Sequence, residues 1–373
     1  MRQLVVIAAG VPWDGVRGSE RQLTEALTAH ADVDVLWVDP PVSPVTPNRY
    51  SGREGRMLKP VVQRLRPGLA RLTPLGPPGW TRPGVRSLTW PLVRAQISRA
   101  LGRRSVDVFV ACHQHDLLGR WNALNVLYGT DDWVAGATLM NQDARFVLRE
   151  EHKALGRANL VLAVGPELAE RWSGMGAHPV VFPNGVDVSA YQDLPLPAPV
   201  PAGFPRVVAG LVGQLSDRID LRQLEAVADT GIGLLLVGPR EPGWGDALLD
   251  RDNVHHVGAV PFEDLPRWFA RLDVGLTPYA DTPFNRASFP LKTLEYLAAG
   301  LPVVSTDLPA SRRLATETAQ VVVAEDFADT VVKTACAVWT PDAVAERRSV
   351  AATHSWAARA AEFTRLAGLR VRA

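Results

Sequence analysis

One lysine and one glutamate lie three residues apart in a segment that is otherwise rich in Leu, Ala and Tyr. They are Lys292 and Glu295, in RASFPLKTLEYLAAGLPVVST at residues 286–306. A helix would place both on one face, about 4–5 Å apart along its axis. A nucleoside diphosphate offers groups that match this pair: phosphates for the ammonium group and a ribose diol for the carboxylate. The alternative is a surface ion pair, which stabilises a helix by about 0.2–0.5 kcal/mol.

The composition of the chain favours the binding interpretation. Its 40 basic residues include only four lysines, so its surface cations are usually arginines. The helix is expected to begin near Phe289, with Ser288 as its N-cap and Pro290 in its first turn. Lys292 would then lie where unpaired N–H groups and the helix dipole already favour an anion.

The elements that must position these residues repeat along the whole chain of 373 residues. Apolar runs rich in β-branched residues alternate with helical segments, which is typical of parallel sheets covered on both faces. We predict an α/β protein with two tandem Rossmann-like, doubly wound domains and an interdomain cleft. The expected parts are an N-terminal domain (1–185), a Pro-rich linker (186–205), a second domain (206–350) and a helix that returns to the first domain (351–373).

Composition and motifs exclude several classes. The two cysteines, Cys112 and Cys336, have no ligand spacing, and no run reaches the roughly 18 apolar residues of a spanning helix, so a cytoplasmic protein is expected. Neither G-x-G-x-x-G after a strand nor a P-loop is present, which removes the main support for dehydrogenases and P-loop NTPases. An Asp-x-Asp at 32–34 lies at the start of a strand, the wrong end for a ligand, and no metal site is expected.

The net charge of +1 conceals a basic insert. Residues 49–104 contain 13 Arg or Lys and one acid, Glu54, giving +12, so the rest of the chain has about −11 (1 − 12). Arginines between Leu, Trp and Pro suit a segment that lies at an anionic membrane surface. The attraction of such a surface is about 1 kcal/mol for each cation near it. A solvated face is the alternative, and nucleic acid is not expected because no aromatic stacking platform accompanies the charge.

The segment SFPLKTLEYLAAGLPVVST (288–306) resembles the donor-binding segment of GT-B-fold glycosyltransferases. Its S-x-P-x-K-x-x-E form is most similar to bacterial exopolysaccharide and teichuronic-acid-type enzymes of glycosyltransferase group 1, including glucuronosyltransferases. The stretches VVFPNGVD (180–187) and HSWAARAAEF (354–363) resemble other parts of the same fold. The resemblance covers most of the chain from about residue 105 and leaves the basic insert outside.

The resemblance implies roles for individual residues. Glu295 would bind the donor ribose and Lys292 a donor phosphate, with Ser288 nearby. In the first loop of the second domain, Gly213 would let the backbone approach the diphosphate, and Arg218 is a further phosphate candidate. Gly18, in the loop after the first strand, would face the donor from the other domain; a plain glycine at a helix start is the alternative.

The resemblance also implies a mechanism. Retaining members have a second glutamate eight residues before the conserved one, and Ala287 stands there, which favours inversion. An inverting enzyme needs a base, for which Asp131 or Asp132 in YGTDDW is the candidate, although either could cap the next helix. His113 and His115 are further candidates for the catalytic site, where they would contact the acceptor or the sugar, although either histidine could instead be structural. Asp14 is a third candidate for the base.

These expectations describe a metal-independent transferase that moves a sugar from a nucleoside diphosphate donor to an acceptor hydroxyl, without a cofactor. The acceptor would be a glycan, a lipid-linked molecule or a small molecule, as in polysaccharide or secondary-metabolite biosynthesis. A peripheral place on the inner membrane face is expected if the basic insert binds lipid. Two alternatives stay open: a nucleotide-sugar epimerase of similar architecture, which needs no acceptor, and an inactive partner that only binds the sugar nucleotide.

Overall fold

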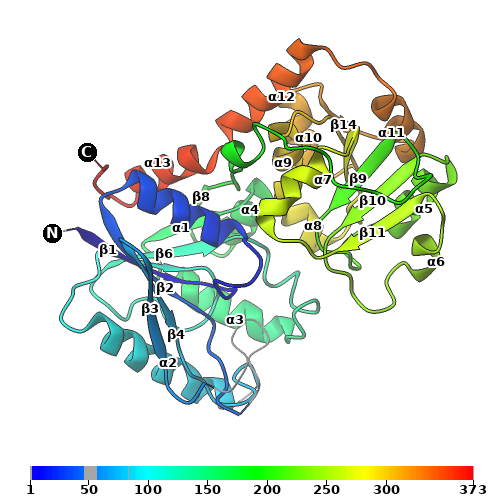
Figure 1. Ribbon diagram of the computed structural model, residues 1–373. Coiled ribbons are helices and arrows are strands. Elements are labelled where there is room, and N and C mark those ends of the chain that lie inside the picture. The colour runs from blue at the N-terminus through cyan, green and yellow to red at the C-terminus, as the bar shows by residue number, and fades with distance from the viewer. Residues whose placement is uncertain (1, 46–56, 83, 373) are drawn as a thin grey trace. The chain divides into compact units, whose positions relative to one another are not determined.

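A computed structural model describes residues 2–45, 57–82 and 84–372, which form two α/β units (Figure 1). Unit 1 comprises residues 1–183 and 356–373, and unit 2 comprises residues 184–355. Each is built on its own sheet. The predicted fold class of two parallel-sheet domains is therefore confirmed. The chain passes from one unit to the other between residues 183 and 184 and between 355 and 356, where boundaries at 185/186 and 350/351 were expected.

The sheet of unit 1 has the strand order β3-β4-β2-β1-β5-β6-β7-β8. Its strands pair in parallel, except that β3 runs antiparallel to β4. The strands are β1 (Gln3–Ala8), β2 (Val33–Val38), β3 (Val61–Arg66), β4 (Leu69–Thr73), β5 (Val108–Ala111), β6 (Leu124–Gly129), β7 (Leu160–Ala163) and β8 (Pro179–Val181). Because parallel strands end at one edge, the loops after β1, β5 and β6 are neighbours.

Helices cover both faces of this sheet (Figure 1). They are α1 (Ser19–His30), α2 (Val85–Leu101), α3 (Ala144–Leu155), α4 (Pro166–Gly174) and α13 (Trp356–Leu366). Helix α13 packs against α1, and its Trp356 and Phe363 lie in the same apolar core as Leu27. The last helix thus belongs to unit 1, although unit 2 precedes it in the chain.

The basic insert is an integral part of unit 1 over its described residues, since 46–56 and 83 lie outside them. It adds β3, β4 and α2 to the sheet and its cover. The buried positions of α2 recur every three or four residues, which is the spacing of one helical face: Thr89, Trp90, Val93, Ile97 and Leu101. Several arginines bind groups elsewhere in unit 1; Arg94 pairs with Asp116 at 2.7 Å and Arg104 with Asp34 at 2.8 Å. The basic excess is thus partly compensated within the fold.

The sheet of unit 2 is parallel throughout, in the order β11-β10-β9-β12-β13-β14. Two apolar cores lie on its faces. The strands are β9 (Val208–Val212), β10 (Gly233–Val237), β11 (Val254–Gly258), β12 (Val274–Thr277), β13 (Val303–Ser305) and β14 (Val321–Val323). The helices are α5 (Leu221–Asp229), α6 (Asp246–Leu249), α7 (Leu265–Phe269), α8 (Pro283–Ala287), α9 (Leu291–Ala298), α10 (Pro309–Glu317), α11 (Phe327–Ala335) and α12 (Pro341–Thr353), with 3-10 turns η1 (Val188–Ala190) and η2 (Phe262–Asp264).

The stretch expected as a linker, 186–205, packs on unit 2. Tyr191 is fully buried there, with its ring 4.9 Å from that of Phe269. The carbonyl of Ala198 accepts hydrogen bonds from the guanidinium of Arg271 at 2.9 and 3.1 Å. A Pro-rich composition predicts irregular backbone correctly here, but buried contacts make the segment part of a domain.

Tyr296 fixes helix α9 to the sheet of unit 2. Its hydroxyl accepts a hydrogen bond from the N–H of Val212 at 2.8 Å and donates one to the carbonyl of Gly210 at 3.1 Å. The ladder between β9 and β12 ends at Gly210, so the hydroxyl satisfies backbone groups beyond it. A Cβ at Gly275 would lie 2.3 Å from the Tyr296 ring, so glycine lets the ring lie directly on β12.

We predict that Tyr296→Phe lowers the free energy of unfolding of unit 2 by about 1–3 kcal/mol, because the buried N–H of Val212 loses its acceptor. Urea unfolding combined with hydrogen exchange of peptides from residues 208–305 measures this change. Tyr279→Phe is the matched control: this half-buried tyrosine makes no hydroxyl hydrogen bond within the described residues. Equal stability of the two variants would show that the Tyr296 hydroxyl does not anchor α9.

Candidate functional site

Lys292 and Glu295 lie in the first half of α9. Glu295 is buried, with 2% of its surface exposed, and its Oε2 lies 2.6 Å from the Nζ of the half-buried Lys292. A solvent-exposed helical ion pair would not bury its carboxylate, so the surface-pair alternative fits Glu295 poorly. Pro290 caps the helix without a side-chain hydrogen bond. The first turn of α9 therefore combines a cation with N–H groups that a helix leaves without intrahelical partners.

Ser288 does not cap α9, and that expectation was wrong. It is the C-cap of the short preceding helix α8, and its hydroxyl donates to the carbonyl of Phe284 at 2.8 Å. Helix α9 begins only at Leu291. The cause is local sterics, because Pro290 disfavours the helical conformation for the residue before it. Ser288 still lies four residues before Lys292, between the two helices.

Two glycines shape the loop after β9. Gly213 has φ +153°, and a Cβ placed there would meet nothing within 4 Å. Gly238, after β10, has φ +144°, and its added Cβ would lie 1.8 Å from the carbonyl oxygen of Gly213. Such φ values are disfavoured for other residues. The backbone at Gly213 thus requires glycine and leaves open space above it, as the predicted approach of a ligand needs.

Arg218 lies against α8, just before the Lys292 segment. Its Nε donates to Oδ1 of Asn285 at 3.2 Å, and its guanidinium lies 4.7 Å from the Phe284 ring centre. The side chain of Asn285 in turn donates to the carbonyls of Arg218 and Ala280. No carboxylate pairs with Arg218 within the described residues. This half-buried cation is therefore available to an anionic ligand.

Asp132, in unit 1, is engaged in the structure of its own loop. Its Oδ1 accepts hydrogen bonds from the N–H groups of Val134 and Ala135 at 3.1 and 2.9 Å. Its Oδ2 lies 3.0 Å from Nε of Arg171, whose other nitrogens bind the fully buried Glu151 at 2.6 and 2.7 Å. Asp132 thus caps a turn of its own loop and not the next helix, because α3 begins at Ala144 and has Asp143 as its N-cap. The role of Asp131 as the base stays a prediction.

His113 belongs to a packed aromatic cluster at the end of β5. Its ring centre lies 4.8 Å from that of His115 and 5.5 Å from that of Trp90, and Trp90 stacks on His115 at 4.3 Å. Its Nδ1 accepts a hydrogen bond from the His115 N–H at 3.2 Å. Burial lowers the pKa of His113 to about 4, so the imidazole is neutral at neutral pH and a weak base. The geometry favours the structural role for this histidine.

Asp14 is tied to the basic insert. Its Oδ2 lies 2.5 Å from Nη1 of Arg71, a buried residue of β4 whose Nε also binds Asp39 at 2.6 Å. Asp39 further accepts hydrogen bonds from the Trp13 N–H and the Trp37 indole, both at 2.9 Å. The loop after β1 is thereby attached to β2 and β4. One oxygen of Asp14 is already used in an ion pair.

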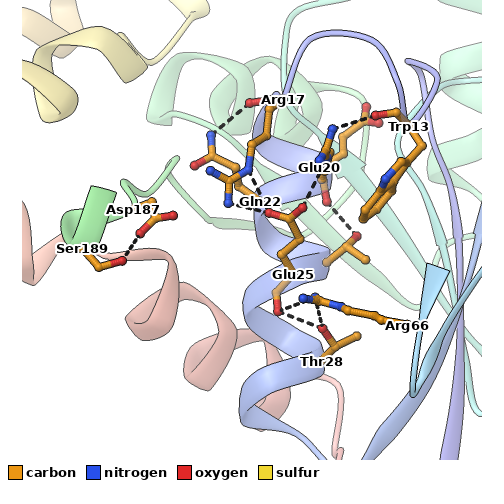
Figure 2. A network of polar contacts seen from close by, with 11 residues as sticks. Trp13, Arg17, Glu20, Gln22, Glu25, Thr28, Arg66, Asp187 and Ser189 are labelled. Atoms are coloured by element: carbon orange, nitrogen blue, oxygen red, sulfur yellow. Dashed lines mark hydrogen bonds and ion pairs between the residues drawn. The ribbon is translucent and has the colours of Figure 1, made fainter. Parts of the chain in front are cut away.

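Gly18 caps α1 in an extended conformation, and an added Cβ there would come no closer than 3.9 Å to another atom. Figure 2 shows the polar network that holds the preceding loop: Arg17 binds Glu25 at 2.6 Å, and Gln22 donates to the Arg17 carbonyl at 3.1 Å. Neither packing nor φ demands glycine at this position. Its proposed contact with a donor is not tested by these contacts.

Glu20, in the first turn of α1, was missed by the sequence analysis. It is buried, and its Oε2 accepts a hydrogen bond from the Gly10 N–H at 2.9 Å. Burial raises its pKa to about 8, and the nearby Asp131 carboxylate adds to this rise while the Gly10 N–H opposes it. A signal was present, because Glu20 shares the helical face of the buried Leu23 and Leu27.

Within the described residues, no group of three or more His, Cys, Asp or Glu side chains is placed to hold a metal ion, and no helix is long and apolar enough to cross a membrane. Metal independence and membrane binding by residues 49–104 stay predictions. Two cavities of about 300 Å³ each lie elsewhere, one under β3, β4 and α2 and one beside Tyr279, Thr306 and Arg312. Neither is lined by Lys292, Glu295 or Asp131.

Comparison with known proteins finds a family match over part of unit 2. Residues 208–339 match the model of glycosyl transferases group 1. This segment is a glycosyltransferase group 1 domain. It contains the candidate donor residues: Gly213, Arg218, Ser288, Lys292 and Glu295. A stretch of 114 residues is 34% identical to TuaH of Bacillus subtilis (strain 168), named as a candidate teichuronic acid biosynthesis glycosyltransferase; the match spans 29% of this chain and 28% of that protein.

Solved structures resemble the whole chain, including the group 1 domain. A sucrose-phosphate synthase from Thermosynechococcus elongatus has a TM-score of 0.74 at 19% identity, covering 98% of both chains. HepE of Anabaena, solved with UDP, has a TM-score of 0.64 at 16% identity, covering 99% of this chain and 100% of its own. The E. coli trehalose-6-phosphate protein bound with UDP-2-fluoro glucose has a TM-score of 0.67 at 12% identity, covering 99% of this chain and 100% of its own. The fold is that of GT-B glycosyltransferases, as predicted.

We predict that Asp132→Ala lowers the free energy of unfolding of unit 1 by about 2–4 kcal/mol, because both the cap and the ion pair with Arg171 are lost. Asp132→Asn should lower this free energy by less, since the amide oxygen still accepts from the N–H groups of Val134 and Ala135. Urea unfolding of both variants beside the unaltered protein measures the difference. If neither variant changes stability, Asp132 is not held as described and returns as a candidate base.

Proposed function

We propose that this protein is a glycosyltransferase that moves a sugar from a nucleoside diphosphate donor to an acceptor hydroxyl. Unit 2 binds the donor and unit 1 supplies the acceptor side. The observation that supports this most directly is the buried Glu295 with Lys292 at 2.6 Å, inside the group 1 domain. Because HepE and the E. coli protein were solved with uridine nucleotides, UDP is the first nucleotide to test.

The residues of unit 2 suit a diphosphate and a ribose. Lys292 can exchange its bond to Glu295 for a phosphate oxygen, which frees the buried carboxylate to accept from the two ribose hydroxyls. Arg218 offers a second cation, and the open backbone at Gly213 lets the diphosphate approach closely. These groups would stabilise the negative charge that develops on the leaving diphosphate without a metal ion.

The proposed reaction inverts the anomeric centre. Asp131 removes the proton of the acceptor hydroxyl, whose oxygen forms a bond to the anomeric carbon. The bond from that carbon to the diphosphate oxygen breaks, and the diphosphate leaves with the electron pair. Ala287, where retaining relatives would have a second glutamate, is a buried residue at the end of α8 and offers no carboxylate. The acceptor is proposed to be a glycan, a lipid-linked molecule or a small molecule.

The first test of this proposed function concerns donor binding. A thermal-shift screen against UDP, GDP, dTDP and CMP should identify one nucleotide that stabilises the protein. For that nucleotide, Lys292→Met combined with Glu295→Gln should weaken binding at least about tenfold, or about 1.4 kcal/mol. The double variant avoids leaving a buried charge unpaired, which would destabilise the fold by itself.

The control is Lys333→Met combined with Asp329→Asn, which removes an exposed ion pair from α11 in the same unit. Isothermal calorimetry on both double variants gives the affinities. No shift with any nucleotide, or equal affinities of the two double variants, would contradict the proposed donor site.

The second test of this proposed function concerns the proposed general base. Asp131→Asn should leave nucleotide affinity unchanged and reduce sugar transfer by at least about 100-fold, the contribution expected of a general base. Transfer is measured as acceptor-dependent nucleotide release, and NMR of the product gives the configuration of its anomeric carbon.

Unchanged transfer by Asp131→Asn would remove this residue from the mechanism, and retention of configuration would remove the inverting reaction. Sugar epimerisation without acceptor would instead support the epimerase alternative. Absence of both activities despite nucleotide binding would support the inactive partner.

A further inference from the structure

Glu20 is a buried acid that is held by backbone N–H groups and pairs with no cation in the part of the chain that the structure describes. Its two carboxyl oxygens lie 2.9 and 3.2 Å from the Gly10 nitrogen. A Cβ at Gly10 would lie 3.1 Å from Oε1 of Glu20 and 3.3 Å from the Cys112 carbonyl oxygen. Glycine at position 10 therefore makes room for the carboxyl group between the loops after β1 and β5. Nothing in the proposed reaction uses this buried group.

The neighbours of Glu20 form a cluster at one edge of the sheet of unit 1. Strands β1, β5 and β6 are adjacent, and Gly10, Cys112 and Asp131 follow their ends. The ionisable groups that act electrostatically on one another here are Glu20, Cys112, Tyr128 and Asp131, with Arg359 of α13 facing Tyr128. Arg359 binds Glu362 on its own helix at 2.8 Å.

Tyr128 gives an independent indication that this cluster is more than packing. The tyrosine is fully buried, and its hydroxyl has no hydrogen-bond partner within the described residues. Burial of an unsatisfied hydroxyl costs about 1–3 kcal/mol, so native proteins rarely retain one without a reason. Burial raises the pKa of Tyr128 well above its usual value, so the hydroxyl stays neutral.

The charge state of Glu20 follows from its surroundings. Burial disfavours its ionised form, the Asp131 carboxylate adds repulsion, and only N–H groups oppose these effects, so its pKa rises to about 8. At neutral pH the carboxyl group is therefore mostly protonated. Two acids that lie close together at one site cannot both ionise cheaply, and here the more deeply buried one retains its proton.

We propose that Glu20 is a positioning residue that remains protonated beside Asp131, so that the pair has a single negative charge when the anionic donor reacts. This inference rests on the proposed function, in which Asp131 is the base. Glu20 neither gives nor takes a proton during the reaction. When it ionises in alkaline solution, a second negative charge at this edge repels the diphosphate donor, and the donor KM rises.

The test that does not depend on activity is carboxyl NMR of protein labelled with [5-13C]glutamate. One signal, absent from Glu20→Gln, should titrate with a midpoint near 8. In Asp131→Asn that midpoint should fall by at least about 0.5 pH units, because a negative charge is removed. Glu25→Gln, on the same helix but paired with Arg17 and Arg21, is the control and should leave the midpoint unchanged. A midpoint near that of ordinary glutamate, or one insensitive to Asp131→Asn, would overturn the inference.

The second measurement is the donor KM and kcat between pH 6 and 9.5, with the nucleotide sugar selected by the binding screen. The unaltered protein should show a donor KM that rises above about pH 8. Glu20→Gln, which keeps the shape and neutrality of the protonated acid, should retain kcat at pH 7 and lose the alkaline rise in KM. Loss of kcat at pH 7 in a folded Glu20→Gln protein would mean that Glu20 acts as a charged base, and the inference would fail.

The two arms separate this inference from the proposed function. Coupled titration of Glu20 and Asp131 in a protein without transferase activity would support the carboxyl pair and contradict the proposed reaction. Transferase activity in a protein whose Glu20 titrates independently of Asp131 would support the reaction and contradict the carboxyl pair.

Discussion

The hydroxyl of Tyr296 is the contact on which the geometry of unit 2 most depends. It satisfies a donor and an acceptor of β9 from within α9, and Tyr296 directly follows Glu295 in the chain. The close approach is possible because Gly275 has no side chain beneath the ring. Any rotation of α9 about its axis would break both hydrogen bonds. Lys292 and Glu295 therefore have a fixed direction relative to the loop at Gly213, which directly follows β9.

In unit 1 the comparable constraint is the pairing of buried charge. Desolvated carboxylates are costly unless a cation or several N–H groups compensate them. Arg171 compensates Asp132 and Glu151, and Arg71 compensates Asp39 and Asp14. Glu20 is compensated by N–H groups, which leaves it as an acid whose proton is part of the structure. The edge of the sheet thus contains acids with quite different electrostatic surroundings.

Sequence patterns predicted the central strands because buried parallel strands are continuous apolar runs, as in VVIA of β1 and GLLLV of β10. They missed β3 and β4 in the basic insert; β3 is an edge strand whose middle residues are exposed and polar. They also missed β8 and β14, each only three residues long. Composition alone made 186–205 a linker, since it does not reveal that Tyr191 is buried.

Site residues were predictable to the extent that backbone chemistry constrains them. The glycine at 213 was implied by the family resemblance, and the pairing of Lys292 with Glu295 follows from their types and spacing. In the structure, Gly213 directly follows β9 and the pair lies in the first half of α9. The engagement of Asp132 within its own loop did not follow from the sequence, because it depends on Arg171, 39 residues further along the chain. The same holds for Glu20, whose burial is set by Gly10 and by the strands beside it.

The family match covers residues 208–339 and stops short of unit 1, although the fold resemblance extends over the whole chain. Under the proposed function this difference has a physical cause. A nucleoside diphosphate presents the same phosphates and ribose to every enzyme that uses it, so the residues around it vary little. An acceptor can be any hydroxyl compound, and the loops and insert that meet it can diverge as long as the sheet persists. Over its described residues, the insert adds β3 and β4 to the sheet of unit 1 and α2 to the helices that cover it. The acceptor is accordingly to be sought from the surface chemistry of unit 1, and the donor from the constrained chemistry of unit 2.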